Sequence, residues 1–144
     1  LLRVNKMADI KNVFDIAARS MSAQMVRLNT VASNLANARS VASSEAEAYR
    51  AIKPVFKTIY ADDIQKTGVA SVDVVDIVAI DRAPDKIYQP GHPKADKDGY
   101  IYTAAVDTEE EMVEMLEASR QYENNVEVIS TLRGLMMRTI NMGK

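Results

Sequence analysis

Two stretches with helical periodicity lie at the two ends of the chain. Over residues 8–38, and again over residues 108–142, apolar positions recur about once per turn of 3.6 residues. They are Ile10, Phe14, Ala17, Met21, Met25, Leu28, Ala32 and Leu35 in the first stretch, and Met115, Ala118, Tyr122, Val126, Ile129, Leu132, Met136 and Ile140 in the second. This spacing predicts two long amphipathic helices.

Local signals predict where these helices begin and end. Asp9 is a candidate N-cap for the first helix, and Thr108 with Glu111 has the spacing of a capping box for the second. The second helix also begins with several Glu and ends with Arg, which suits the helix dipole. Asn37 and the polar run after it predict the end of the first helix.

Residues 48–106 follow a different pattern. Short runs typical of strands occupy residues 52–60, 72–80 and 100–104, and turn residues separate them, among them Thr67–Gly68. We therefore expect a small β-hairpin-like insert of two to four strands in the middle of the chain.

The fold class that follows is mainly α. The two terminal helices are expected to pair as an antiparallel coiled coil, because both apolar stripes lie near its 3.5-residue period. Residues 1–39 carry a net charge of +4 and residues 107–144 carry −4, which favours this pairing. The predicted units are an N-terminal helix and linker over 1–47, the β-rich insert over 48–106 and the C-terminal helix over 107–144, with the two helical units forming one core domain.

Composition narrows the function. The net charge of the 144 residues is −2, whereas nucleic-acid-binding domains are usually strongly basic, so nucleic acid is not expected as a partner. The absence of Cys excludes disulfides and thiolate zinc sites. The longest apolar run includes Asp73 and Asp76, so no membrane span is expected. No signal-peptide pattern is found near the start, where Met7 is a candidate for the natural first residue.

The candidate chemical sites are weak. His92 is the only histidine, which rules out a two-histidine metal site within one chain, and no nucleophile elbow accompanies it. Asp96, Asp98 and Gly99 resemble part of a calcium-binding loop, but the first and last ligand positions of such a loop are not acidic here. We therefore expect no catalytic residue, no metal and no cofactor, and a protein that is not an enzyme.

The apolar stripe on the C-terminal helix is too wide for one partner helix. Beside the recurring positions lie six further apolar residues: Met112, Val113, Leu116, Val128, Leu135 and Met137. Two paired helices cannot bury both stripes and these flanks, so much of this surface is expected to contact other subunits. The sequence therefore predicts a protein that forms assemblies.

Both ends also carry family motifs. The N-terminal stretch contains Ala23–Gln24, Leu28 and the run Asn34–Ala38, followed by Tyr49–Arg50, and the C-terminal stretch contains Glu111–Val113 and the segment 118–126. This combination resembles the flagellar axial proteins, which include rod, hook and hook-associated proteins. The segment 92–102, Val106–Asp107 and the short length resemble the proximal branch of the flagellar basal-body rod protein family.

This resemblance implies a structural subunit of the proximal rod of the bacterial flagellum. Such a subunit polymerises in a helical array that transmits torque from the membrane ring to the hook and encloses the export channel. The implied partners are copies of itself, other proximal and distal rod proteins, the rod-base adaptor of the MS ring and the flagellar type III export apparatus. The implied location is the basal-body rod in the periplasm, reached without a cleaved signal peptide.

The assembly seam is expected along the two helices. Its candidate residues are Phe14, Met21, Met25, Leu28, Asn34, Leu35 and Asn37, opposite Tyr122, Val126, Ile129, Leu132 and Met136. The two Asn would set the register or cap the helix end, or they would simply end the helix.

Two other functions stay open at this point. A cytoplasmic helical adaptor or secretion chaperone would use the same helices as a binding module. A small hydrolase would depend on His92.

Overall fold

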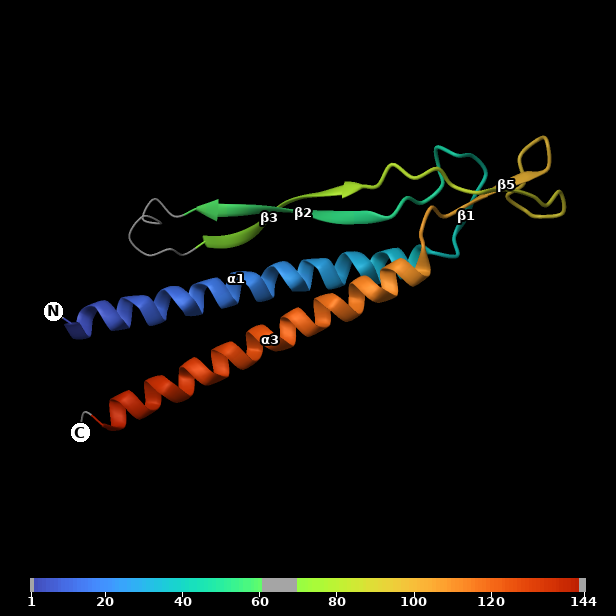
Figure 1. Ribbon diagram of the computed structural model, residues 1–144. Coiled ribbons are helices and arrows are strands. Elements are labelled where there is room, and N and C mark those ends of the chain that lie inside the picture. The colour runs from blue at the N-terminus through green and yellow to red at the C-terminus, as the bar shows by residue number, and fades with distance from the viewer. Residues whose placement is uncertain (1, 61–69, 143–144) are drawn as a thin grey trace.

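The computed structural model describes residues 2–60 and 70–142 (Figure 1). Its elements, in chain order, are helix α1 (Leu2–Asn37), strands β1 (Val41–Ala42), β2 (Ile52–Tyr60), β3 (Ala70–Ala79), β4 (Lys86–Tyr88) and β5 (Tyr100–Thr103), and helix α3 (Thr108–Asn141). The predicted helix–strand–helix order is confirmed. The predicted turn at Thr67–Gly68 lies outside the described residues.

The two helices pack against each other in opposite directions. Helix α1 has 36 residues and α3 has 34, and both chain ends lie at the same end of the pair (Figure 1). The ribbons lie close together where α1 ends and α3 begins, and they separate toward the termini (Figure 1). The packing of the terminal helices against each other, as the sequence predicted, is therefore confirmed.

The strands form two small antiparallel sheets. Strands β2 and β3 pair from Ile52 with Ala79 to Tyr60 with Ala70, with a bulge opposite Val55 and Phe56. This ribbon lies along α1, on the side away from α3 (Figure 1). The second sheet, in the order β1–β5–β4, lies beyond the joined ends of the helices. The β part is thus larger than the small hairpin-like insert that the sequence predicts, because it forms two sheets and its ribbon makes a layer beside α1. The fold is therefore two packed helices with small antiparallel sheets rather than mainly helical.

Small side chains form most of the buried core. Ala17, Ala23 and Ala118 are buried in the helices, and Ala51 and Ala105 are buried where the insert joins them. Alanines at these positions allow the elements to approach closely, whereas the large apolar residues at the candidate seam are only half-buried or exposed. The single chain therefore buries little of its large apolar surface.

Two predicted helix caps are wrong. Helix α1 begins at Leu2 and continues through Asp9, which is therefore not an N-cap. The N-cap of α3 is Asp107 rather than Thr108, and its carboxylate accepts hydrogen bonds from the backbone N–H groups of Glu109 and Glu110. A carboxylate forms the stronger cap because it also interacts favourably with the positive end of the helix dipole.

One side chain ties the helix layer to the β layer. Asn34 is fully buried, and its amide donates to the carbonyl of Ile52 at 2.9 Å and accepts from the N–H of Ile52 at 2.9 Å. The Tyr49 hydroxyl donates to the same Asn34 oxygen at 3.0 Å. Asn34 thus pairs with the first residue of β2 as a neighbouring strand would.

We predict that Asn34→Ala destabilises the chain by about 2–4 kcal/mol, because it leaves the half-buried N–H and C=O groups of Ile52 without these partners and removes the acceptor of the Tyr49 hydroxyl. Urea unfolding followed by circular dichroism measures this change. The matched control is Asn37→Ala, which removes one bond from the Asn37 amide to the Ser33 carbonyl of the same helix. A cost for Asn34→Ala no larger than for the control would contradict the assigned role.

Candidate assembly interface

An ion-pair network joins the start of α3 to the β ribbon. The Glu110 carboxylate accepts a hydrogen bond from the Lys53 ammonium of β2 at 2.8 Å. Its other oxygen accepts from the Arg82 guanidinium, which follows β3, at 2.9 Å. One carboxylate therefore holds both sides of the ribbon against the helix pair.

This network changes the ionisation of its members. The hydrogen bonds from Lys53 and then from Arg82, with the charges of both groups, lower the pKa of Glu110 from 4.5 to about 2. The hydrogen bond with Glu110 likewise raises the pKa of Lys53. Folding therefore favours the ionised pair.

Polar contacts also fix the two helices to each other. Arg27 of α1 forms a charged hydrogen bond with Glu114 of α3, from Nε at 2.8 Å, and lies 3.5 Å from Glu117. Further along, the Asn125 amide donates to the Ser20 hydroxyl at 2.9 Å. These two contacts set the register of the antiparallel helices at positions 11 residues apart on α3.

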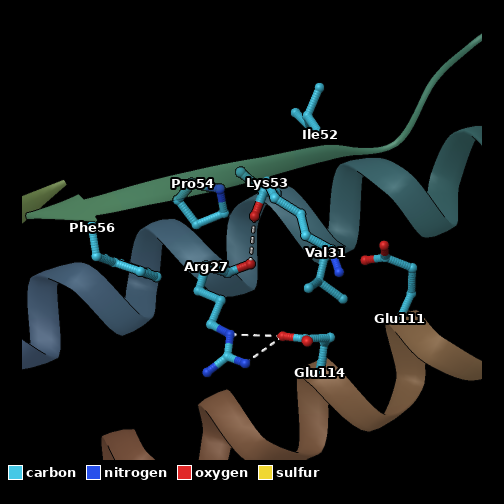
Figure 2. A pocket seen from close by; sticks show the side chains of 9 residues that line it. Arg27, Val31, Ile52, Lys53, Pro54, Phe56, Glu111 and Glu114 are labelled. Carbon is cyan, nitrogen blue, oxygen red and sulfur yellow. Dashed lines mark hydrogen bonds and ion pairs between the residues drawn. The ribbon is translucent and has the colours of Figure 1, made fainter. Parts of the chain in front are cut away.

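A cleft of about 300 Å³ lies between β2, α1 and the start of α3. In Figure 2, Lys53, Pro54 and Phe56 come from β2, whereas Arg27 and Glu114 face each other across the gap between the helices. Thr30, Val31, Ile52 and Glu111 complete the lining. The cleft thus combines apolar walls with the charged groups of Arg27, Lys53 and Glu114, which are already paired, and with the carboxylate of Glu111.

The outer surface of α3 is rich in exposed apolar side chains. Met112, Val113 and Leu116 are 53–65% exposed near its start, and Leu135 and Met137 are just over half exposed near its end. On a monomeric protein such a surface is unusual, and it is typical of a contact with other chains. All five residues belong to the apolar flank that the sequence predicts to face neighbours.

The structure distributes the candidate seam residues over several environments. Phe14, Met21, Leu28 and Leu35 of α1 and Tyr122, Ile129, Leu132 and Met136 of α3 are half-buried. Met25 and Val126 are exposed, each at 44%. Asn34 binds the strand β2, and Asn37 lies at the last position of α1, where its amide donates to Ser33. The half-buried residues and the exposed ones remain a predicted seam for assembly.

The sequence reasoning missed the network of Glu110, Lys53 and Arg82. The Glu residues at the start of α3 predicted only a favourable interaction with the helix dipole. No local signal could have revealed the pairing, because Lys53 is 57 positions away from Glu110. The buried contact of Asn34 with Ile52 was missed for the same reason.

The loop that contains His92 is held by its own turns. The Asp96 carboxylate accepts from the N–H groups of Asp98 and Tyr100, and Gly99 has a positive φ of 83° that favours glycine. His92 accepts from the N–H of Lys94. Within residues 2–60 and 70–142, no group of three or more acidic or histidine side chains is placed to bind a metal ion.

The two described helices lack the features of membrane-spanning segments. Neither α1 nor α3 is long and apolar enough to cross a bilayer.

Comparison with known proteins identifies the family. Residues 14–39 match the family model described as flagella basal body rod protein, and residues 97–142 match the one described as flagellar basal body rod FlgEFG protein C-terminal. The flagellar basal-body rod protein FlgC of Escherichia coli O157:H7 is 43% identical over 134 residues, which cover 92% of this chain and 97% of the relative. The chain belongs to the FlgC family of flagellar basal-body rod proteins.

Other FlgC proteins show the same extent of similarity. The relative from Salmonella typhimurium strain LT2 is 41% identical over 92% of this chain. The relative from Aquifex aeolicus is 36% identical over 138 residues, which are 96% of this chain and all of the relative. The matched regions include both helices and the β ribbon between them, so the identification from the end motifs is confirmed.

We predict that Glu110→Gln removes part of the acid sensitivity of the fold. Ionised Glu110 stabilises the folded chain above pH 4.5, and this contribution is lost as the pH falls from 4.5 toward 2. The effect is at most about 1 kcal/mol, because the side chains of the network are more than a third exposed. The unfolding free energy in urea at pH 6.5 and at pH 3 measures it.

The matched control is Glu109→Gln, which neutralises the exposed carboxylate one position earlier. In this variant, the difference in unfolding free energy between pH 6.5 and pH 3 should be closer to that of the unchanged chain. Equal differences for Glu110→Gln and the unchanged chain would show that the network does not contribute.

Proposed function

We propose that this chain is a structural subunit of the proximal rod in the bacterial flagellar basal body. The observation that carries the proposal is the exposed apolar surface of α3 in a member of the FlgC family. A single chain leaves this surface in water, whereas a rod subunit would bury it against neighbours. The relatives are described as rod proteins, which does not favour a secretion chaperone or a hydrolase.

Neighbours in the rod would complete the pairing of the helices. Toward the termini α1 and α3 separate, and the residues of α3 beyond Ala118 are half-buried or exposed (Figure 1). We propose that the coiled-coil pairing expected from the 3.5-residue period forms in this half when neighbouring helices fill the gap. The helix pair is then the core unit, and the β-rich insert is a second contact unit.

The mechanical role follows from close packing. A helical array of such subunits would transmit torque from the membrane ring to the hook, because interdigitated helices resist compression and shear. The long helices would enclose the export channel. The partners would be copies of the chain, other proximal and distal rod proteins, and the rod-base adaptor of the MS ring.

The route to this location would be the flagellar type III export apparatus, without a cleaved signal peptide. The rod would cross the periplasm. Cells that lack their own rod protein of this family, and that carry a tagged copy of this chain instead, test the proposal. Recovery of swimming and of the tag in purified basal bodies is expected. A tag confined to the cytoplasm would overturn the proposal.

We predict that Leu116→Glu abolishes swimming in this assay while the chain still folds. Leu116 is 53% exposed, so the change should alter the unfolding free energy by less than about 0.5 kcal/mol. In an assembled rod, the same carboxylate would be buried without a partner at a cost of several kcal/mol. Swimming and urea unfolding measure the two effects separately.

The matched control is Asn124→Glu, which adds the same charge to an exposed and already polar position of α3. It should leave both swimming and stability close to those of the unchanged chain. Normal swimming with Leu116→Glu would mean that this part of α3 faces water in the rod.

A further inference from the structure

We propose that the cleft between β2, α1 and the start of α3 receives the C-terminal end of α3 from a second copy of the chain, so that copies join head to tail. This inference rests on the proposed function, since it names one contact of the assembled subunit. The first argument is the chemistry of the cleft. The charges of Arg27 and Glu114 neutralise each other, and so do those of Lys53 and Glu110 at its edge. The apolar wall contains Val31, which is buried, together with Pro54 and Phe56, and Phe56 is 40% exposed.

The second argument is an apolar stripe near the end of α3. Val128, Leu135 and Met142 follow one another at intervals of seven residues, so they lie on one face of the helix. They are 43%, 51% and 88% exposed. They do not belong to the face toward α1, where Ile129, Leu132 and Met136 are half-buried. The stripe therefore offers large apolar side chains of the kind that the cleft can accommodate.

The third argument is distance. Leu135 follows Glu111, which lines the cleft, by 24 residues of one continuous helix, which is a separation of about 36 Å. The stripe cannot fold back to the cleft of its own chain. Because the two surfaces are different, the contact joins copies head to tail. It builds a ring or an open array rather than a symmetric dimer.

The fourth argument is charge. The start of α3 brings the carboxylates of Glu110, Glu111, Glu114 and Glu117 to the cleft and its rim. They face the three cations Arg27, Lys53 and Arg82. Residues 125–142 instead carry Arg133 and Arg138 against Glu127. Their opposite net charges favour the approach of one end to the other and oppose the contact of two like ends. A second copy thus supplies both the apolar stripe and the matching charge.

The test uses the absence of cysteine from the chain. Phe56→Cys and Leu135→Cys are prepared as separate full-length variants, and circular dichroism verifies that each folds. Mixed under mild oxidation, they should yield at least about tenfold more disulfide dimer than either variant alone. The matched control mixes Leu135→Cys with Lys97→Cys, whose cysteine lies on an exposed loop beyond the helix pair, and this mixture should give little dimer.

Two results would overturn the inference. One is a yield from the mixture no higher than that of the control. The other is equal linking by a single variant, which indicates a symmetric contact. Swimming complementation keeps the two proposals apart. Cells that swim without the cross-link retain the proposed function and refute only this contact, whereas absence of the tag from basal bodies refutes the function.

Discussion

The arrangement of this chain depends on the pairing of the Asn34 amide with the backbone of Ile52. Asn34 lies in the last turn of α1, where the backbone N–H groups are already bonded within the helix. A donor for the strand must therefore come from a side chain. Asn34 supplies one donor and one acceptor, the two groups that a strand residue would offer, and it does so from a fully buried position. These two bonds fix the position along α1 at which β2 begins. The β2–β3 ribbon then extends from this position along the helix (Figure 1).

The charged contacts then fix the position of α3 relative to the β ribbon and to α1. Glu110 joins both sides of the ribbon to α3, and Arg27 joins α3 to α1. Each exposed pair is weak in isolation, but together they hold β2, α1 and α3 around the cleft of Figure 2. The buried core itself is made largely of alanine, so it allows close approach and leaves the large apolar residues on the outside.

The prediction from sequence succeeded where the signal was local. Periodicity predicted the ends of both helices to within one residue, except for the start of α1. The predicted strand over 52–60 matches β2. The breadth of the apolar stripe on α3 predicted exposed residues such as Met112 and Leu116. The strands β1 and β4 were missed, because two or three residues carry no periodicity. Their pairing with β5 depends on a partner that is distant in the chain.

The sequence by itself determined the two helices, their end motifs and hence the family, because hydrophobic period and motif spacing are properties of neighbouring residues. Only the tertiary structure decided which faces of those helices are occupied within one chain. Asn34 could have ended the helix, and Glu110 could have remained in water. Their partners are Ile52, Lys53 and Arg82, which lie 18 to 57 positions away. Contacts at such separations follow from the packing of the ribbon against the helices, and the same packing creates the cleft and leaves the outer stripe of α3 uncovered.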